Sequence, residues 1–504
     1  MHPAIVMPNR TPQGMTMSRE SKELLAALHD LRHTATTEAA ARIERWRPDI
    51  EQPSYAASAA NLAQYLALRH HDLRHLQRAL MRHGLSSLGR FESRALVTLN
   101  TVEAALAALV DGTGPRADWP PTHEAFFRGE ACLQANTSAL FGGSTDNAGR
   151  ILVTLSTEAA HEPGYLLEIA RRGADAVRIN CAHDDADDWA AMIENTQKAG
   201  LAVDRRIAVL MDLGGPKFRI GNVKRQPGER LVTGDRFMLV RDETMFGPDA
   251  MIAAVCDPPD ILDHLTVGAE VSFDDGKLPG IVEACAPGSL LICVQRAPPK
   301  GFKMKPERGL LFPSADLHLD PLTPTDLTNL DFVARHADMI GYSFVQSADD
   351  ITHLQDELAK RRPDWRRLGI IAKIETTQAV KNLPDIIVRA AGRQPFGVMI
   401  ARGDLAVAIG FERLAEMQEE ILWLCEAAHV PVIWATQVLE EMVKSGLPTR
   451  GEMTDAAMAA RAECVMLNKG PNVGEAISAL RDLLRRMMEH QSKKTPRLRA
   501  LHSW

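Results

Sequence analysis

Residues 206–221 read RIAVLMDLGGPKFRIG, a short apolar run that ends at an acid and is followed by a glycine-rich turn. The run Ile207–Met211 is typical of a buried strand, and the Gly-Gly-Pro sequence that follows Asp212 and its neighbouring leucine ends it. The turn then presents Lys217 and Arg219. The sequence therefore predicts a buried strand with charged groups at its carboxyl end. Similar runs occur both before and after it in the chain.

From Arg150 onward, short apolar runs of this kind alternate with helical segments such as PGYLLEIARRG and AEMQEEILWLCEAAH. Such alternation predicts a parallel sheet built from βα units. Eight runs make up the set: ILVTLS, DAVRIN, RIAVLMDL, ADMIGYSFV, LGIIAKIE, FGVMIARGD, VPVIWATQV and ECVMLNKG. Eight is the number of strands that closes a (β/α)8 TIM barrel, so this is the predicted fold class.

Two stretches of the chain do not follow the barrel pattern. Residues 222–309 carry Gly/Pro turns and short β-like runs, which predict a small β-barrel domain inserted in a barrel loop as a lid. Residues 1–149 have leucines at helical spacing and predict an N-terminal α-helical region. The barrel is therefore predicted in two parts, 150–221 and 310–504.

Composition excludes several classes of protein. The chain of 504 residues is 45% hydrophobic and 24% charged with a net charge of -7, which gives no reason to expect nucleic acid or a membrane as partner. Its seven cysteines are scattered without a CxxC pair, which argues against a disulfide framework or a zinc site. Without an apolar run of signal-peptide or membrane-spanning length, we expect a cytoplasmic protein.

Polar side chains gather where the predicted strands end. In a barrel of this type the working residues project from the carboxyl ends of the strands. Those ends supply Arg178, Asn180, Asp212, Ser343, Lys373, Glu375, Arg402, Asp404, Thr436 and Gln437. Carboxylates such as Glu375 and Asp404 are the ligands that Mg²⁺ or Mn²⁺ prefers. Lys373 and Arg178 add the positive charge that phosphoryl transfer or enolate formation requires.

These segments resemble the pyruvate kinase family. AVRINCAHD (176–184) is similar to its Arg-x-Asn-x-Ser-His segment, and MDLGGPKFRIG (211–221) to its Asp-Thr-Lys-Gly-Pro-Glu-x-Arg-Thr-Gly segment. Three longer stretches match almost without gaps: IIAKIETTQAVKNL, VMIARGDLAVAI and PVIWATQVLEEMVKSGLPTRGEMTDAA. The resemblance covers roughly residues 150–489 and includes VSFDDGKL (271–278) in the lid.

The resemblance implies a reaction and a role for each matched residue. The family moves the phosphoryl group of phosphoenolpyruvate to ADP, giving pyruvate and ATP, with a divalent metal. Glu375 and Asp404 are expected to hold Mg²⁺ or Mn²⁺, and Lys373 to stabilise charge on the phosphoryl group and the enolate oxygen. Arg178 is expected to bind the phosphate of phosphoenolpyruvate. The backbone around Gly403 and Asp404 and the hydroxyl of Thr436 are expected to receive the carboxylate and help deliver the proton.

The resemblance also implies a nucleotide site. Arg219 is expected to contact nucleotide phosphates, with Asn180 and His183 close to the nucleotide. The lid is expected to contribute Asp275 and Arg308.

The potassium site of the family is altered in this chain. The family's ligands correspond here to Asn180, Ala182, Asp212 and the carbonyl of Leu213, so that Ala182 lacks a hydroxyl. The family's common glutamate is Lys217, whose ammonium is similar to potassium in size and charge. We therefore interpret Lys217 as a replacement for potassium and expect activity without that ion.

Other departures concern the ends of the matched region. The first strand ends TLSTEA and the eighth MLNKGPN, where the family has Thr-Ile-Gly-Pro-Ala-Ser and Leu-Ser-Gly-Glu-Thr. The family's usual C-terminal domain is expected to be missing, and with it control by a sugar phosphate. The helical N-terminal region is longer than the family's and is a candidate element of a homo-oligomer.

Two other functions remain compatible with the residues. One is a metal-dependent aldolase or lyase that forms an enolate from a pyruvate-like acid. The other is a non-catalytic descendant that binds a metabolite or a protein partner. The lid and Arg219 argue against the former, and the set Lys373, Glu375, Asp404 and Thr436 argues against the latter.

Overall fold

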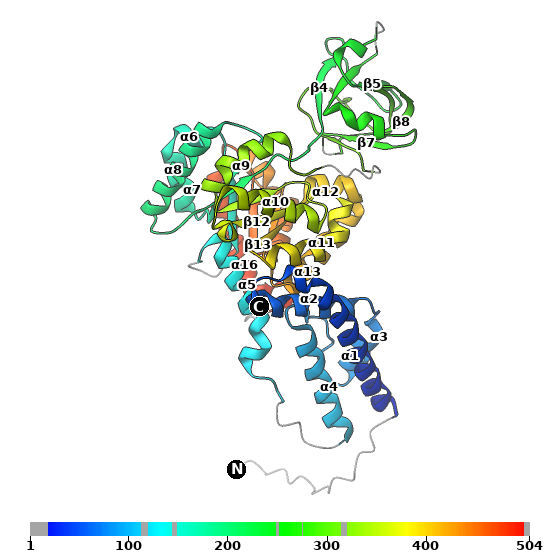
Figure 1. The fold of residues 1–504 in the computed structure, drawn as a ribbon, viewed down its shortest axis with the longest axis vertical. Helices are drawn as coiled ribbons and strands as arrows, with labels where there is room; N and C mark the ends of the chain where they lie inside the picture. The colour runs from blue at the N-terminus through cyan, green and yellow to red at the C-terminus, as the bar shows by residue number, and fades with distance from the viewer. Residues whose placement is uncertain are drawn as a thin grey trace, which may run out of the picture. The chain divides into compact units, whose positions relative to one another are not determined.

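The computed structural model describes residues 19–111, 119–143, 149–247, 251–274, 276–313 and 320–497 (Figure 1). The chain forms two compact units. The first comprises Met1–Arg47 and Ala57–Ala131, and the second Pro48–Ala56 and Cys132–Trp504. The division falls inside helix α5, whereas the sequence pattern changes only at Arg150.

The N-terminal unit is helical. Its helices are α1 (Arg19–Trp46), α2 (Ala56–Arg69), α3 (Arg74–Arg82), α4 (Ala95–Asp111) and the first part of α5 (His123–Phe141), with a short 3-10 turn at Glu92–Arg94. Leucines at helical spacing form its core, and Leu28, Leu62, Leu80 and Leu106 are fully buried. Helices α1 and α4 pack against each other in this unit. A further 3-10 turn, Pro53–Tyr55, belongs to the second unit.

One helical stretch of the described residues, Glu92–Asp111, is long and apolar enough to cross a membrane by length and composition. It includes α4, whose residues Leu99, Val102 and Leu106 are buried in the N-terminal unit. The core helix of a globular unit meets the same criterion, so this stretch is weak evidence for membrane insertion.

The second unit contains a closed barrel of eight parallel strands, which confirms the predicted TIM barrel. The order around the barrel is β1-β15-β14-β13-β12-β11-β3-β2. The strands are β1 (Arg150–Thr154), β2 (Ala176–Asn180), β3 (Ala208–Asp212), β11 (Met339–Tyr342), β12 (Gly369–Ile374), β13 (Phe396–Ala401), β14 (Val432–Ala435) and β15 (Cys464–Leu467). Each coincides with one of the eight apolar runs.

Helices cover the outside of the barrel. They are α6 (Glu158–His161), α7 (Pro163–Arg172), α8 (Ala186–Ala202), α9 (Pro324–His336), α10 (Ala348–Arg361), α11 (Thr377–Ala391), α12 (Arg402–Ile409), α13 (Phe411–Ala427), α14 (Glu440–Ser445), α15 (Arg450–Ala459) and α16 (Val473–His490). Capping boxes fix the starts of α9, α10 and α15, in which Thr323, Ser347 and Thr449 accept from the backbone three residues on. A short hairpin of β16 (Gln491–Ser492) and β17 (Thr495–Pro496) follows α16.

The last turn of α5 plugs the amino-terminal end of the barrel. Leu140 and Phe141 are buried in one cluster with strand residues of the barrel interior. A Cβ atom on Gly369 or Gly397 would lie 2.6 or 3.1 Å from the Leu140 side chain, so these glycines make room for the leucine. The plug explains why the end of α5 belongs to the barrel unit.

A seven-stranded sheet is inserted between β3 and β11. Its strands are β4 (Arg219–Lys224), β5 (Arg236–Val240), β6 (Ala253–Asp257), β7 (Glu270–Phe273), β8 (Leu278–Ala286), β9 (Ser289–Val294) and β10 (Leu310–Leu311), in the order β10-β7-β8-β9-β5-β6-β4. The edges meet, because the Ile220 amide donates to the Arg308 carbonyl and the Leu310 amide to the Phe218 carbonyl, both at 2.8 Å. The inserted sheet therefore closes around its own apolar core.

Candidate active site

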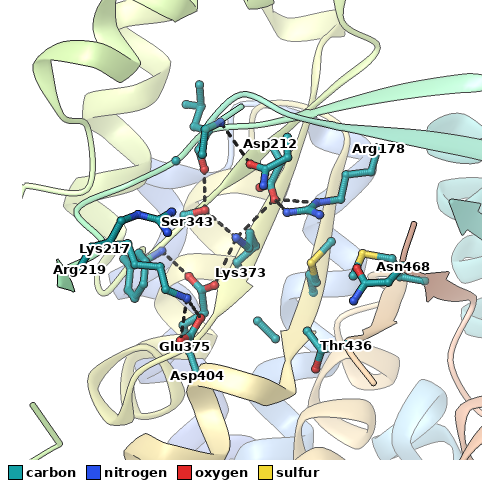
Figure 2. Close-up of a pocket in the computed structure, with 18 residues that line it drawn as sticks. Arg178, Asp212, Lys217, Arg219, Ser343, Lys373, Glu375, Asp404, Thr436 and Asn468 are labelled. Carbon is teal, nitrogen blue, oxygen red and sulfur yellow. Dashed lines mark hydrogen bonds and ion pairs between the residues drawn. The ribbon is translucent and has the colours of Figure 1, made fainter. Parts of the chain in front are cut away.

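A cavity of about 230 Å³ lies at the carboxyl ends of the barrel strands (Figure 2). Parallel strands bring their carboxyl ends to one rim, so residues far apart in sequence meet there. Ten residues to which the resemblance assigned a role line the cavity: Arg178, Asn180, Asp212, Leu213, Lys217, Arg219, Lys373, Glu375, Asp404 and Thr436. Ser343, a further candidate from the predicted strand ends, also lines it. We call this space the central cavity.

The ammonium of Lys373 connects the acidic groups of the central cavity (Figure 2). It donates to the Ser343 hydroxyl at 2.6 Å and lies 3.4 Å from Asp212 Oδ2 and 3.2 Å from Glu375 Oε1. Burial alone lowers the pKa of Lys373, but the attraction of the two carboxylates outweighs it, and the pKa is raised. Lys373 therefore stays charged and fixed, as stabilisation of a developing negative charge requires.

Asp212 holds Arg178 in place. The carboxylate is 1% exposed, and its Oδ2 accepts from Arg178 Nε at 2.8 Å and from a second nitrogen of the same guanidinium. Burial raises the pKa of Asp212, but Arg178 and then Lys373 outweigh this effect, so the pKa is lowered. Arg178 also donates to the Thr154 hydroxyl at 3.3 Å. The guanidinium is therefore oriented at the cavity wall.

Glu375 and Asp404 bring two carboxylates to the same cavity. Oε2 of Glu375 accepts from the Phe344 amide at 2.7 Å. Burial raises the pKa of Glu375, and the nearby charge of Asp404 adds to the rise, while Lys373 opposes it. A bound divalent cation would relieve the repulsion between the two acids.

The donor set fits a hard divalent ion. Mg²⁺ takes oxygen ligands, keeps several waters and is commonly held by one or two carboxylates together with substrate oxygens. Within the described residues no group of three His, Cys, Asp or Glu side chains is arranged to hold a metal. Glu375 and Asp404 would therefore hold such an ion with open positions, rather than in a closed structural site.

The ammonium of Lys217 lies on Asp404, at 3.1 Å from Oδ1 and 3.2 Å from Oδ2. The structure therefore differs from our expectation that this lysine occupies the potassium position beside Asp212 and Leu213. The physical reason is charge pairing. Asp212 is already neutralised by Arg178 and Lys373, so Asp404 is the carboxylate left for Lys217.

The predicted monovalent-cation ligands bond mainly with the protein itself. The Leu213 carbonyl accepts from the Ser343 hydroxyl at 2.7 Å, and Asn180 Oδ1 accepts from the Ala182 amide at 3.2 Å. Oδ2 of Asp212 is taken by Arg178 and Lys373. Oδ1 of Asp212 is buried and accepts no hydrogen bond from the part of the chain that the structure describes.

Thr436 is held in a strained backbone at the end of β14. Its φ is 66°, in the left-handed region that a β-branched residue rarely adopts, and Gln437 follows with a φ of 58°. The hydroxyl of Thr436 accepts from the Gly403 amide at 3.1 Å. Gly403 itself does not line the central cavity, but this hydrogen bond connects it to Thr436, which does.

Arg402 supports the strained segment. Its Nε donates to the Ala435 carbonyl at 3.0 Å, and another nitrogen donates to the Thr436 carbonyl. Asp455 pairs with the guanidinium at 2.5 and 2.9 Å, and the Trp434 ring lies 4.9 Å beneath it. The strain at Thr436 is therefore stabilised by a buried arginine with contacts on several sides.

A second cavity of about 200 Å³ shares Arg178, Asn180 and Asn468 with the first. It is also lined by His183, Lys444, Lys469, Thr154, Glu440 and Val443. Burial lowers the pKa of His183, and the charges of Lys469 and Arg219 lower it further. We call this space the side cavity; it holds a neutral imidazole among cations, which suits an anionic ligand.

The lid residues predicted for the nucleotide do not all reach the central cavity. Arg219 lines the cavity and donates to the Glu307 carbonyl at 3.4 Å. Arg308 instead pairs with Asp274 at 3.1 Å within the inserted sheet and lines neither cavity described above. Asp275 lies outside the described residues.

Sequence reasoning did not identify Asp455, Lys444 or Lys469 as site residues. Asp455 comes from α15, and only the matched stretch that contains it points to it. Lys469 lies two residues after the end of β15, so its position near a strand end was the available signal. The altered eighth strand end adds this cation to the side cavity.

The chain is similar in sequence to known proteins. Residues 147–476 match the family model for pyruvate kinase, barrel domain. The chain is 32% identical to the pyruvate kinase of Agrobacterium vitis over 342 residues, which cover 66% of this chain and 67% of that protein. It is 30% identical to that of Thermococcus litoralis, with coverages of 65% and 66%, and 29% identical to that of Dictyostelium discoideum, with 63% and 61%.

The chain thus spans about two thirds, or somewhat less, of the length of these relatives. The matched region is the barrel with its insertion, which contains both cavities. The family model covers well over half of the chain, and the chain belongs to the pyruvate kinase family.

Proposed function

We propose that this chain transfers the phosphoryl group of phosphoenolpyruvate to ADP and yields pyruvate and ATP. The arrangement of Lys373 between Asp212 and Glu375, with Arg178 and Asp404 at the same cavity, carries this proposal. The P–O bond to the enol oxygen breaks as a new P–O bond forms to an oxygen of the acceptor's terminal phosphate. The enolate carbon then takes up a proton.

Each residue has a role set by its position. Arg178, oriented by Asp212, binds the phosphate of the donor, and Lys373 stabilises charge on the phosphoryl group and the enolate oxygen. The Gly403 amide and the Thr436 hydroxyl receive the carboxylate, and Thr436 helps deliver the proton. Such positioning accounts for most of the catalysis of phosphoryl transfer.

A divalent cation, Mg²⁺ or Mn²⁺, is part of the proposal. Glu375 and Asp404 would hold it, as their two carboxylates at one cavity suggest. The ion supplies positive charge that neutralises the transferring group.

The proposed enzyme does not require potassium. The oxygens of Asn180 and Leu213 that would bind this ion already accept hydrogen bonds from the protein, and so does Oδ2 of Asp212, whereas Oδ1 of Asp212 accepts none from the described residues. The ammonium of Lys373 beside Asp212, rather than that of Lys217, supplies positive charge at this position.

We propose the side cavity and Arg219 as the contact region for the acceptor nucleotide. His183, Lys469 and Asn180 line the side cavity, and Arg178 and Asn180 line both spaces. An anionic acceptor would therefore bind next to the donor phosphate.

A coupled assay with phosphoenolpyruvate, ADP and Mg²⁺ in potassium-free buffer tests the proposal. We expect turnover that disappears in the Lys373→Met variant. No turnover with or without added potassium would refute it. Exchange of the pyruvate methyl protons without any phosphoryl transfer would instead favour an aldolase or lyase that forms the enolate.

A further inference from the structure

Lys217 is held against Asp404 by a turn with its own anchors. The buried carboxylate of Asp326 accepts from the Gly214 amide at 2.9 Å and from the Gly215 amide at 3.1 Å. The Lys217 stem passes Gly309 so closely that a Cβ atom there would lie 3.1 Å from Lys217 Cε. The turn and the glycine direct the ammonium into the central cavity.

The ammonium contacts both oxygens of one of the proposed metal ligands. It lies 3.1 and 3.2 Å from the two oxygens of Asp404, and the two side chains are 25% and 13% exposed. A divalent cation of the Mg²⁺ or Mn²⁺ type binds carboxylate oxygens at about 2.0–2.2 Å. An ammonium and such an ion would repel each other strongly if both bound this carboxylate.

The pairing of charges at Asp404 also indicates that the ammonium and a divalent ion exclude each other there. The ammonium of Lys217 is the cation that the structure places on both oxygens of Asp404. Movement of this ammonium to another position in the cavity leaves the charge of the Asp404 carboxylate unpaired. Withdrawal of Lys217 therefore creates the attraction that a divalent ion needs.

We propose that Lys217 is a built-in competitor of the divalent cation, which must displace its ammonium from Asp404 to bind. This inference rests on the metal site of the proposed function. The displaced ammonium would remain at the same cavity, where Oδ1 of Asp212 is a buried acceptor without a hydrogen bond from the described residues. Divalent affinity is then set by an exchange of cations and not by the carboxylates alone.

Direct binding of Mn²⁺ to the full chain tests the competition without any turnover. Free Mn²⁺ is followed by electron paramagnetic resonance in the absence of phosphoenolpyruvate and ADP. Lys217→Met removes the ammonium that pairs with Asp404 and competes with the metal. We therefore expect the Kd for Mn²⁺ to fall by about five-fold or more. Lys217→Arg keeps the charge and is expected to bind Mn²⁺ as weakly as the parent chain.

Two further variants test whether a change in Mn²⁺ affinity is specific to Lys217 and Asp404. Lys198→Met removes a lysine of similar charge that pairs with Glu194 at 2.7 Å on the outside of the barrel, and its Kd should equal that of the parent. In an Asp404→Asn background, Lys217→Met should have no effect, because the contested carboxylate is gone. Thermal unfolding of each variant verifies that it is folded.

An unchanged or higher Kd for Mn²⁺ in folded Lys217→Met would overturn the proposal. So would an equal gain in affinity in the Asp404→Asn background, since the effect would then not pass through Asp404. A chain that shows the competition yet transfers no phosphoryl group would contradict only the proposed reaction. A chain that transfers it without the competition would contradict only this inference.

Discussion

The central cavity and the side cavity differ in how their charged groups are held. In the central cavity the side chains of Asp212 and Glu375 are almost fully buried, and the ammonium of Lys373, whose side chain is 12% exposed, lies beside both carboxylates. In the side cavity Lys469 and His183 are exposed, and Lys444 pairs with Glu440 of the same helix at 2.6 Å. Buried, mutually paired groups keep one geometry, whereas exposed groups adapt to what binds. This difference supports our proposal that the central cavity carries the chemistry and that the side cavity recognises the acceptor.

The largest effect is expected in the central cavity from Lys373→Met. The change removes the ammonium that bonds Ser343 and lies beside two carboxylates, so we expect kcat to fall by roughly 10³ or more. Steady-state kinetics with phosphoenolpyruvate and ADP measure it. Lys360→Met, on the exposed side of α10, is the matched control and should keep full activity. A loss of less than ten-fold would show that this cavity does not carry the chemistry.

Lys217→Glu should have the next largest effect. It places a third carboxylate beside Asp404 and Glu375 and removes a cation, so we expect kcat to fall by roughly 10². Added potassium should not restore the activity, because the ammonium of Lys217 lies on Asp404 and not at the potassium position. Rates measured over a range of KCl, with choline chloride at matched ionic strength as control, test this expectation. Full activity of the variant, or its rescue by potassium, would contradict the position that we assign to the ammonium.

Lys217 also marks the limit of what the sequence could predict. The alternation of apolar runs predicted the eight strands, and the strand ends predicted eight of the residues that line the central cavity. Both follow from chain direction alone, because parallel strands present their carboxyl ends together. The partner of a lysine is decided by which acids remain unpaired, and that depends on Arg178 and Lys373 in three dimensions. Asp455 was missed for the same reason, since it acts through Arg402.

A smaller effect is expected from Arg402→Met, which tests whether strain near the central cavity is functional. Arg402 is a positioning residue, because it contacts the Thr436 backbone and Asp455 but does not line the cavity. Without it Thr436 should leave its left-handed backbone, and kcat should fall by roughly ten-fold with KM nearly unchanged. Exchange of the pyruvate methyl protons should slow in parallel, since Thr436 is proposed to help place the proton.

Arg413→Met on α13 is the control for Arg402→Met, because this arginine is 61% exposed and pairs only with Glu416 among the described residues. If kcat is unchanged in folded Arg402→Met, the strain at Thr436 does not serve catalysis. If KM for phosphoenolpyruvate rises instead, the arginine supports binding of the donor.

The smallest effect is expected in the side cavity, from Lys469→Met. Loss of one exposed cation should raise KM for ADP by about three- to ten-fold and leave kcat and KM for phosphoenolpyruvate nearly unchanged. The same variant has a second readout that needs no turnover. Burial and then the charge of Lys469 lower the pKa of His183, so removing the lysine should raise that pKa toward its ordinary value.

Proton NMR of the His183 ring, assigned with His183→Gln, measures this pKa in the parent and in Lys469→Met. A raised pKa together with a raised KM for ADP would place the lysine beside both the imidazole and the acceptor. A raised pKa with an unchanged KM would mean that the acceptor binds away from the side cavity. The charged groups of the two cavities would then differ in exposure, but the side cavity would not bind the acceptor. Arg219 and the inserted sheet would be the remaining candidates for acceptor binding.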